Sequence, residues 1–426
     1  MGNEVSRRKF IQGLGLAAAA AATGVMATGC GGNSSSSSDG SNGIDLTNWD
    51  AVKEAAKGTE VVFAGFGGME TFNSYVSDTL IPAVKKKYDV NLTWKKFDVE
   101  SDIVTMINNE KSGGKKAGEG TLSLLWITLN ESSTMQDMGS LYKDIRQNIP
   151  SVNAYIDPSC GGMAGMEKSI SVSTIPWGPL HTSYIYDSSK VSWTPKNAKE
   201  LLEWCKQYEG KMSYPTEYAE SFWWPLMIDV CGEDWYKNLD ANSTYNDVKA
   251  AMEPGLKYLR DLNPYLWQKG KSYDVYGEYE NLASGEVWNQ FMDTPYVLDT
   301  YVDQKVLPDT IKEFVFEDIG VYEWWGHQIA IPYDCPNVAG AMCALDVIFS
   351  PEQAYAEEQQ TGYEASLDPN RLDEEGRQYE QSVKFSDRCI SKDKINSLKK
   401  IDPAPATIID TVYEVWRGEV AGKYNE

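Results

Sequence analysis

The chain has 426 residues, more than one hydrophobic core usually spans, so we expect a body of two lobes. Acidic residues number 62 and basic residues 39, and the formal net charge is −23. A body this acidic repels phosphate groups, which excludes nucleic acid and anionic lipid headgroups as expected partners.

The first 29 residues have the pattern of an export signal. Residues 6–11 read Ser-Arg-Arg-Lys-Phe-Ile, a weakly apolar run rich in Ala and Gly follows, and Ala-Thr-Gly precedes Cys30. A basic start, a short apolar run and small residues before a cut site are typical of a secretory signal. The run is too short and too weakly apolar to span a bilayer, which takes about 20 apolar residues.

Two details of this signal predict a lipoprotein. The arginine pair resembles the twin-arginine motif, by which bacteria export folded proteins. The small residues before Cys30 resemble a lipobox, in which the Cys is acylated and becomes the first residue of the mature chain. The alternatives are the general secretory route and an ordinary signal peptide in which the Cys is incidental. Residues 31–43 are nearly all Gly, Ser and Asn, so we expect a flexible tether over residues 30–46.

Strands and helices alternate in the first part of the body. Apolar runs of strand length predict strands, and apolar residues at helical spacing predict helices. The expected elements are a strand over 60–65, a helix over 71–88, a strand over 90–97, a helix over 100–111 and a strand over 121–127. This alternation predicts an α/β domain in which helices cover the faces of a parallel sheet.

The rest of the chain has more helix. We expect strands over 182–187, 287–292 and 327–331, and helices over 197–208, 219–230, 246–262, 337–349 and 405–416. Asp368, Asn370 and Asp373 have part of a calcium-loop pattern, but the Gly and Glu spacing is wrong. An acidic helix start is therefore predicted at this place.

No motif for catalysis, a metal or a cofactor is found. His181 and His327 are the only two histidines, and neither has a second His at metal-ligand spacing. The chain has no nucleophile elbow, no phosphate-binding loop and no dinucleotide fingerprint. We therefore expect no enzyme, no metal and no cofactor. Abundant carboxylates leave open an exported, lipid-anchored glycan hydrolase with a carboxylate pair, and a non-transport interaction lipoprotein is the other alternative.

Six cysteines remain besides the one at the cut site. They are Cys160, Cys205, Cys231, Cys335, Cys343 and Cys389. No two of them form a C-x-x-C pair, which argues against a zinc knuckle or a thioredoxin-type dithiol. Export permits disulfides, whereas folding first in a reducing cytoplasm opposes them, so both states stay open.

Four stretches of the body resemble a known family. They are residues 59–68, which read Thr-Glu-Val-Val-Phe-Ala-Gly-Phe-Gly-Gly, residues 120–127, residues 175–187 and residues 326–353. Their order is similar to that in the extracellular solute-binding proteins of bacterial ABC importers, of the type II periplasmic-binding-protein superfamily. Within it, the chain resembles a subgroup of the branch related to thiamine, polyamine and iron receptors.

The resemblance implies two α/β lobes with mixed sheets and helices on both faces, joined by two crossover hinge strands. The implied boundaries are residues 47–176 for the first part of lobe 1, 177–332 for lobe 2, and 333–426 for the return to lobe 1 and the C-terminal helices. Residues 128–130 and 220–224 depart from the family pattern in loops that should face the ligand. No relative's ligand therefore transfers to this chain.

Ligands of open α/β sheets bind beyond the carboxyl ends of the strands, and the candidate contacts follow from this rule. They are Phe66, Gly67, Gly68, Asn130, Glu131, Trp177, Ser221, Trp224, Asp293, Tyr296, Trp325 and Tyr333. The amides of Gly67 and Gly68 suit an anion, whereas aromatic faces with Asp293 or Glu131 suit a cation or a ring. For each residue, packing or capping is the alternative role.

The resemblance also implies the partners and the place of action. We expect a small solute, cationic or aromatic, an ABC permease, and contact with the membrane through the N-terminal lipid. The body is expected to be monomeric and to lie in the periplasm or at the outer face of the cytoplasmic membrane.

Overall fold

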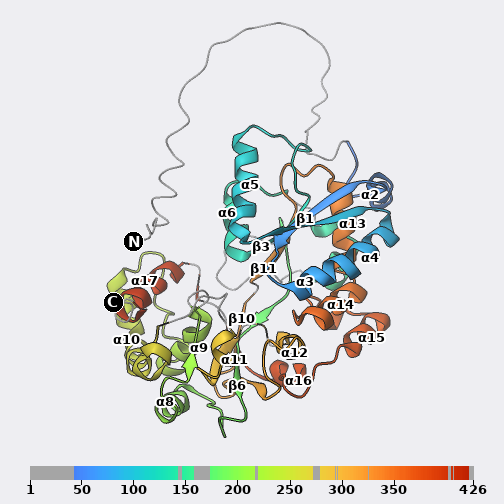
Figure 1. Ribbon diagram of the computed structural model, residues 1–426. Coiled ribbons are helices and arrows are strands. Elements are labelled where there is room, and N and C mark those ends of the chain that lie inside the picture. Colours follow the sequence, from blue (N-terminus) through green and yellow to red (C-terminus); the bar gives the residue numbers. More distant parts are fainter. Residues whose placement is uncertain are drawn as a thin grey trace. The chain divides into compact units, whose positions relative to one another are not determined.

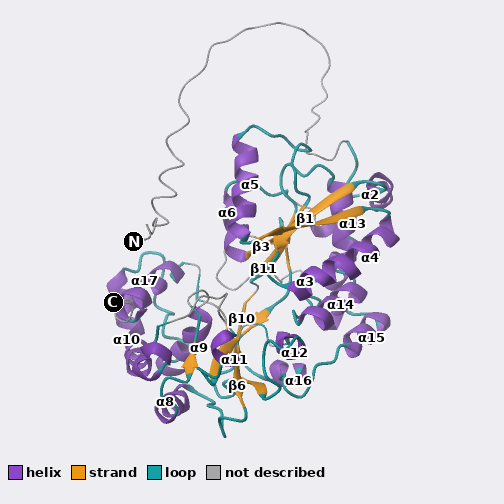
Figure 2. Cartoon of the chain, in the orientation of Figure 1, coloured by secondary structure: helices purple, strands orange, loops and turns teal. Residues whose placement is uncertain are grey.

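A computed structural model describes residues 43–142, 146–157, 173–215, 219–271, 279–292, 294, 296–324, 326–401, 404–405 and 407–421. Their strands form a five-stranded, a four-stranded and a three-stranded sheet, with helices around them (Figures 1 and 2). No helix in the described part of the chain is long and apolar enough to cross a membrane.

The five-stranded sheet is mixed, in the order β2-β1-β3-β11-β4. Its strands are β1 (Glu60–Phe66), β2 (Asn91–Phe97), β3 (Leu124–Thr128), β4 (Thr174–Pro176) and β11 (His327–Ala330). β1 pairs in parallel with β2 and β3, whereas β11 pairs antiparallel with β3 and β4. The predicted parallel sheet is therefore confirmed, and β11 adds to it a strand from late in the chain.

Helices cover both faces of this sheet (Figure 2). Alternate side chains of β3 point to opposite faces, because Leu124 and Trp126 belong to one buried cluster and Leu125 and Ile127 to another. α5 (Glu100–Ser112) and α6 (Leu129–Asp137) pack on the Leu125 face. The other face is covered by α2 (Trp49–Ala56), α3 (Glu70–Ser74), η1 (Tyr75–Leu80), α4 (Ile81–Tyr88), α7 (Pro150–Tyr155), α13 (Val338–Ile348) and α14 (Pro351–Thr361).

The four-stranded sheet has the order β7-β8-β6-β9. Its strands are β6 (Ser183–Asp187), β7 (Met212–Ser213), β8 (Asn289–Met292) and β9 (Ile311–Phe314). One face packs against α8 (Ala198–Gln207), α9 (Ala219–Cys231), α10 (Tyr245–Leu262) and α17 (Ile409–Glu419), and the other against α11 (Glu280–Ala283) and α12 (Val297–Asp303). Tyr184 and Phe291 point to the first face, and Ile185 and Met292 to the second.

Short elements complete the described part. β5 (Leu180–His181), β10 (Val321–Trp324) and β12 (Lys400–Ile401) form the three-stranded sheet, in the order β12-β10-β5. The others are η2 (Arg146–Asn148), η4 (Asn263–Tyr265), η5 (Trp267–Lys269), η7 (Pro369–Arg371), α15 (Glu374–Ser382) and α16 (Lys392–Ser397). Asp373 caps α15 by accepting a hydrogen bond from the Gly376 amide at 2.7 Å, as expected for an acidic helix start.

Two large buried clusters organise the molecule, and the chain passes between them three times. One contains Trp126 and Trp177, and the other contains Tyr184 and Trp224. The passages run through residues 177–184, 322–329 and 384–400. Two of these passages correspond to the two crossover strands expected from the sequence. The third passage exists because the apolar side of α17 packs on α10 in the second cluster. The domain boundaries stay a prediction, but Ile401, Ala404 and the buried side of α17 belong to the second cluster and not to the first, to which residues 333–426 were expected to return.

The remaining differences from the expected elements are local. The helix expected over 71–88 is interrupted by the wider turns of η1. The closing helix begins at Ile409 rather than at Pro405. Five of the six body cysteines, Cys205, Cys231, Cys335, Cys343 and Cys389, are free thiols, and Cys160 lies outside the described residues, as does Cys30.

Candidate functional site

The carboxyl ends of three parallel strands meet at one edge of the five-stranded sheet, which we name the strand-end edge. Phe66 of β1 is paired with Phe97 of β2, and β3 ends beside them at Thr128. β11 runs the opposite way, so its first residue, His327, pairs with Thr128. The amide of Trp177, just after β4, donates a hydrogen bond to the His327 carbonyl oxygen at 3.1 Å. In open α/β sheets, this is the edge where ligands bind.

The turn after β1 consists of glycines because side chains do not fit there. A Cβ on Gly67 would lie 2.6 Å from the Cβ of Lys96, and a Cβ on Gly68 would lie 2.2 Å from the ring of Phe66. The Gly67 amide donates to the Phe97 carbonyl oxygen at 2.8 Å. The prediction that the Gly67 amide is available to an anion is therefore wrong, since the β1–β2 pairing uses it.

Asn73 of α3 holds this turn in place. Its side chain is buried, its Oδ1 accepts a hydrogen bond from the indole nitrogen of Trp94 at 2.9 Å, and its Nδ2 donates to the Gly67 carbonyl oxygen at 2.9 Å. One amide thus joins the turn to β2. Sequence reasoning missed Asn73, because no spacing distinguishes it from the other asparagines of the chain.

Large aromatic side chains pack directly beneath the strand-end edge. They are Phe63, Phe72, Trp94, Trp126 and Trp177. The ring centroids of Trp126 lie 4.3 Å from Phe72 and 5.3 Å from Trp177. Trp177 is only 5% exposed, and its indole nitrogen donates to Oε2 of Glu357 at 3.0 Å. The prediction of Trp177 as a ligand contact is corrected: its ring belongs to the core because aromatic neighbours enclose it.

His327 extends this aromatic cluster at the start of β11. Its ring stacks on Tyr363 at a centroid distance of 5.5 Å and meets Trp126 edge to face at 5.2 Å. Burial lowers the pKa of His327 to about 4, so the imidazole is uncharged at neutral pH. An uncharged ring at this edge does not repel a cationic solute. The sequence marked His327 only as a residue at the edge of a strand.

Three of the predicted contacts in the second half of the chain are buried. Ser221, Trp224 and Tyr296 are each 1% exposed. Trp224 packs against Trp235 at a centroid distance of 5.6 Å, and Tyr296 stacks on Phe385 at 4.5 Å. Their prediction as ligand contacts is corrected, since α9 with Ser221 and Trp224 is apolar nearly all round and enclosed by its neighbours, and the ring of Tyr296 is covered by Phe385.

Two of the predicted polar contacts, Asn130 and Glu131, lie at the start of α6. Glu131 lies in the first turn of α6, beside the strand-end edge, and its amide is capped by Oγ1 of Thr128 at 3.4 Å. Asn130 lies in the same turn. Asp293 and Trp325 lie outside the described residues. Phe66, Gly68, Asn130 and Glu131 are the predicted residues that the fold brings to this edge, and their contact with a solute stays a prediction.

Tyr333 lies at the opposite edge of the sheet. β11 is antiparallel to β3, so the residues after β11 reach the edge at which the parallel strands begin. There the Tyr333 hydroxyl donates to the Lys115 carbonyl oxygen at 3.1 Å. The fold therefore does not bring Tyr333 to the strand-end edge, because the residues that follow an antiparallel strand leave the sheet at the other edge.

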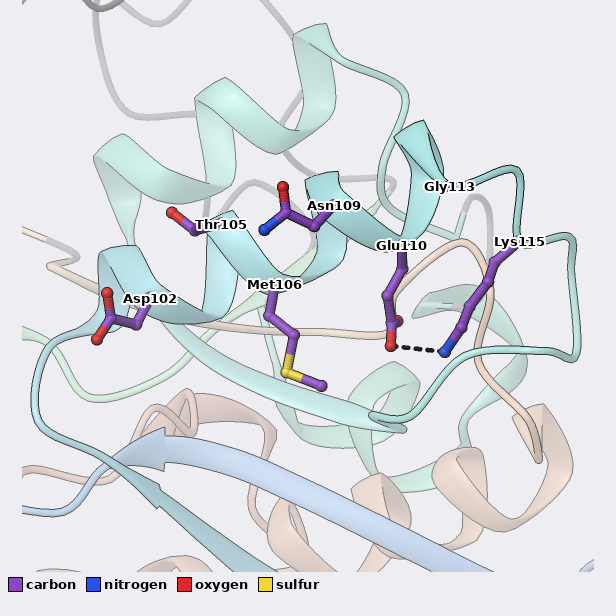
Figure 3. A pocket seen from close by; sticks show the side chains of 7 residues that line it. All are labelled: Asp102, Thr105, Met106, Asn109, Glu110, Gly113 and Lys115. Carbon is purple, nitrogen blue, oxygen red and sulfur yellow. Dashed lines mark hydrogen bonds and ion pairs between the residues drawn. The ribbon is translucent and has the colours of Figure 1, made fainter.

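A hollow of roughly 620 Å³ lies on the outer face of α5 (Figure 3). It is lined by Asp102, Thr105, Met106, Asn109, Glu110, Gly113 and Lys115, and none of the strand-end residues is among them. Glu110 and Lys115 point toward each other and form an ion pair at 2.8 Å.

Burial, together with the neighbouring Glu110, raises the pKa of Asp334 to about 6. Among the described residues, no group of three or more His, Cys, Asp or Glu side chains could hold a metal ion.

The chain is similar in sequence to one curated protein over most of its length. Protein YnjB of Escherichia coli (strain K12) is 25% identical over 349 residues, which cover 79% of this chain and 87% of YnjB. No protein-family model matches the chain.

Solved structures of solute-binding proteins have the same fold. The spermidine/putrescine ABC-transporter substrate-binding protein PotD of Streptococcus pneumoniae superposes with a TM-score of 0.60 at 14% identity, covering 86% of this chain and 100% of PotD. The TpPotD lipoprotein of Treponema pallidum gives 0.57 at 13% identity, covering 84% of this chain and 99% of that one. IdiA (FutA) of Trichodesmium, in complex with iron and citrate, gives 0.56 at 10% identity, covering 84% and 99%. The chain thus has the type II periplasmic-binding-protein fold of the ABC-transporter solute-binding proteins.

Proposed function

We propose that this chain is a lipid-anchored, extracytoplasmic receptor that binds a small solute and delivers it to an ABC importer. The observation that carries the proposal is the strand-end edge, where three parallel strands, the start of the antiparallel β11 and the first passage between the clusters meet. An edge of this kind offers loops and helix starts to a ligand, while the passages allow the two lobes to close on it.

The proposed solute is a cation or carries a flat ring. Glu131 at the start of α6 supplies a carboxylate beside the edge, Phe66 supplies a partly exposed ring, and His327 adds no charge there at neutral pH. PotD is named for spermidine and putrescine, and the IdiA (FutA) structure is a complex with iron and citrate. These compounds therefore belong in the first set of solutes to test.

A thermal-shift screen of the purified protein tests the receptor proposal. The set comprises spermidine, putrescine, thiamine, ferric citrate and a neutral sugar. A solute at 100 times its Kd stabilises the protein by about 2.7 kcal/mol. Phe66→Ala and Glu131→Gln should lose the shift, whereas the control Val306→Ala, at a residue 40% exposed in the loop between α12 and β9, should keep it. Chemical turnover of the solute, or no shift with any compound of the set, would contradict the proposal.

The lipid anchor is proposed on the residues before Cys30, and it needs a separate test. Mass spectrometry of the mature N-terminus should find an acylated Cys30. The variant Cys30→Ser should move from the membrane fraction to the soluble extract of the cell envelope. A wild-type chain that is already free of the membrane would remove the anchor from the proposal and leave solute binding unaffected.

A further inference from the structure

The side chain of Tyr363 lies over the aromatic cluster at the strand-end edge. Tyr363 follows the C-cap of α14, Gly362, whose φ of +81° is a conformation that L side chains rarely adopt. A Cβ on Gly362 would lie 2.4 Å from the amide nitrogen of Val297, so glycine is also required by lack of space. The turn at Gly362 therefore fixes the place at which Tyr363 leaves the helix.

The Tyr363 ring joins the two sides of this edge. On one side it stacks on His327 at the start of β11, at a centroid distance of 5.5 Å and with 22° between the planes. On the other side its hydroxyl donates to Sδ of Met69, just after the glycine turn, at 3.2 Å. A thioether sulfur is a weak acceptor, so this bond adds little to the hold on the ring. A Cβ on Gly178 would lie 3.5 Å from Cδ1 of Tyr363, so the first passage borders the ring as well.

The indole of Trp126, in contact with these rings, has an unused hydrogen-bond donor. Trp126 is 1% exposed, and its Nε1 is buried without a hydrogen-bond partner among the described residues. Within the same described part of the chain, the buried Nδ1 of His327 has no partner either. Buried polar groups of this kind are rare in folded proteins, because an unmade hydrogen bond costs stability. Two of them on neighbouring rings indicate a place where a ligand supplies the partner.

The Trp126 N–H is directed away from β1 and toward β11. The opposite side of the indole, at Cε3, lies against Gly65 of β1, where a Cβ would approach it to 2.9 Å. β3 lies between β1 and β11 in the sheet, so the Nε1 side of the ring faces β11. The ring centroid of Trp126 lies 5.2 Å from His327 and 6.4 Å from Tyr363, edge to face in both pairs. The three rings, Trp126, His327 and Tyr363, thus meet at one place, which we name the ring site.

We propose that the solute carries a flat aromatic ring with a hydrogen-bond acceptor in the ring plane, and that this ring replaces the Tyr363 side chain in the ring site. Stacked on His327, the solute ring keeps the contact that Tyr363 makes. Its acceptor pairs with the Trp126 N–H, which can act only as a donor.

This proposal names a class of solute and excludes another. The tyrosine ring has no acceptor atom within it, so Tyr363 leaves the Trp126 donor unpaired. A linear aliphatic amine supplies neither the ring nor the acceptor. Tyr363 is only partly buried, so its side chain can turn outward when a solute ring enters. This specificity rests on the proposed function, because the ring site lies at the strand-end edge.

Tyr363→Ala tests the ring site with two small probes, toluene and 4-methylpyridine, at pH 8. The probes have the same shape, but 4-methylpyridine has a ring nitrogen, unprotonated at this pH, in place of one CH group. The variant should bind 4-methylpyridine about tenfold more tightly than toluene, because one hydrogen bond is added. In proton–nitrogen correlation spectra of the indole groups, 4-methylpyridine should move the Trp126 signal downfield, and toluene should not. Trp126→Phe lacks this signal and so assigns it.

Tyr379→Ala is the matched control, since Tyr379 of α15 is also a partly buried tyrosine and its hydroxyl donates to Glu375 at 3.4 Å. It should show no preference between the probes and leave the Trp126 signal in place. If Tyr363→Ala does not fold, Tyr363→Leu replaces it, because leucine keeps most of the volume, is not flat and can turn aside; the same preference is expected. Equal affinities for the two probes, or a Trp126 signal that does not move, overturn the ring site.

The ring site and the receptor proposal can fail separately. A solute from the thermal-shift screen that binds without moving the Trp126 signal overturns the ring site and leaves the receptor. A screen without a binder contradicts the receptor, whereas a preference of Tyr363→Ala for 4-methylpyridine still supports the ring site.

Discussion

The indole nitrogen of Trp94 and the side-chain oxygen of Asn73 are joined by a 2.9 Å hydrogen bond, and through it β2 supports the glycine turn after β1. The bond fixes which way the Asn73 amide faces, because its oxygen is occupied by Trp94 and its nitrogen is left to hold the Gly67 carbonyl. These two hydrogen bonds hold the turn at the strand-end edge without any solute.

Asn73→Ala should destabilise the protein by about 1–3 kcal/mol, because the indole nitrogen and the Gly67 carbonyl each lose their partner. Urea unfolding at pH 7 measures the loss. The control is Asn370→Ala, since Asn370 is exposed and bonds only to its own turn, and it should cost less than about 1 kcal/mol. Equal losses in the two variants would mean that Asn73 has no special role in holding the turn.

Glu357 should behave as an uncharged acceptor. Burial raises its pKa well above the ordinary value, which favours the uncharged carboxylic acid as the group that accepts from Trp177. Glu357→Gln keeps the acceptor and the volume and should change the free energy of unfolding by less than about 1 kcal/mol. Glu357→Ala should cost about 2–4 kcal/mol, because it leaves a cavity and an unpaired indole nitrogen. A large loss in the Gln variant, measured by urea unfolding, would show that Glu357 is ionised.

Glu313 should make the protein less stable as the pH rises from about 4.5 to 7. Its pKa is about 7 in the folded chain and 4.5 in the unfolded chain, so in this window only the folded state holds the proton. The lost stability amounts to at most about 3 kcal/mol. Glu313→Gln should flatten this part of the pH profile of the unfolding midpoint. A profile that keeps the wild-type slope between pH 4.5 and 7 would contradict the assignment.

His327 should act in the opposite direction. Its folded pKa of about 4 lies below the ordinary value of 6.5, so between these two values only the unfolded chain binds the proton. Stability from this residue is present above pH 6.5 and is lost as the pH falls toward 4. His327→Phe keeps a ring to stack on Tyr363 and should make the protein less sensitive to acid in this window. Thermal unfolding of both proteins at pH 4.5 and 7.5 measures the difference, and an equal fall in the two would remove His327 as its source.

Local pattern accounts for much of the fold. The near-continuous apolar run around Leu124 and the alternation from Val90 to Phe97 fall on β3 and β2, and the helical spacing of 100–111 falls on α5. These elements could be predicted because the side chains of one strand or one helix face must all suit the same buried environment. The resemblance to solute-binding proteins added the fold class, and the solved structures with the same fold confirm that class.

The candidate site was harder to predict, and the reasons are specific. Trp177 and Trp224 were expected to meet a solute because they stand near strand ends or helix starts, but neighbouring rings bury both. Tyr333 was misplaced because the direction of β11 depends on its pairing with β3, in which His327 lies opposite Thr128, 199 residues earlier in the chain. Asn73 could not be singled out because its role in helix α3 depends on Trp94 of strand β2.

The amino-acid order alone predicted many of the longer strands and helices, the export signal, and the absence of recognised catalytic motifs, because these depend on residues close to one another in the chain. The direction of β11, the third passage through residues 384–400 and the stacking of Tyr363 on His327 were settled only when distant segments packed together. Burial is the physical reason: it is a property of the assembled cluster, and it alone turns Glu313 into an acid with a pKa of about 7 and His327 into an uncharged ring at neutral pH.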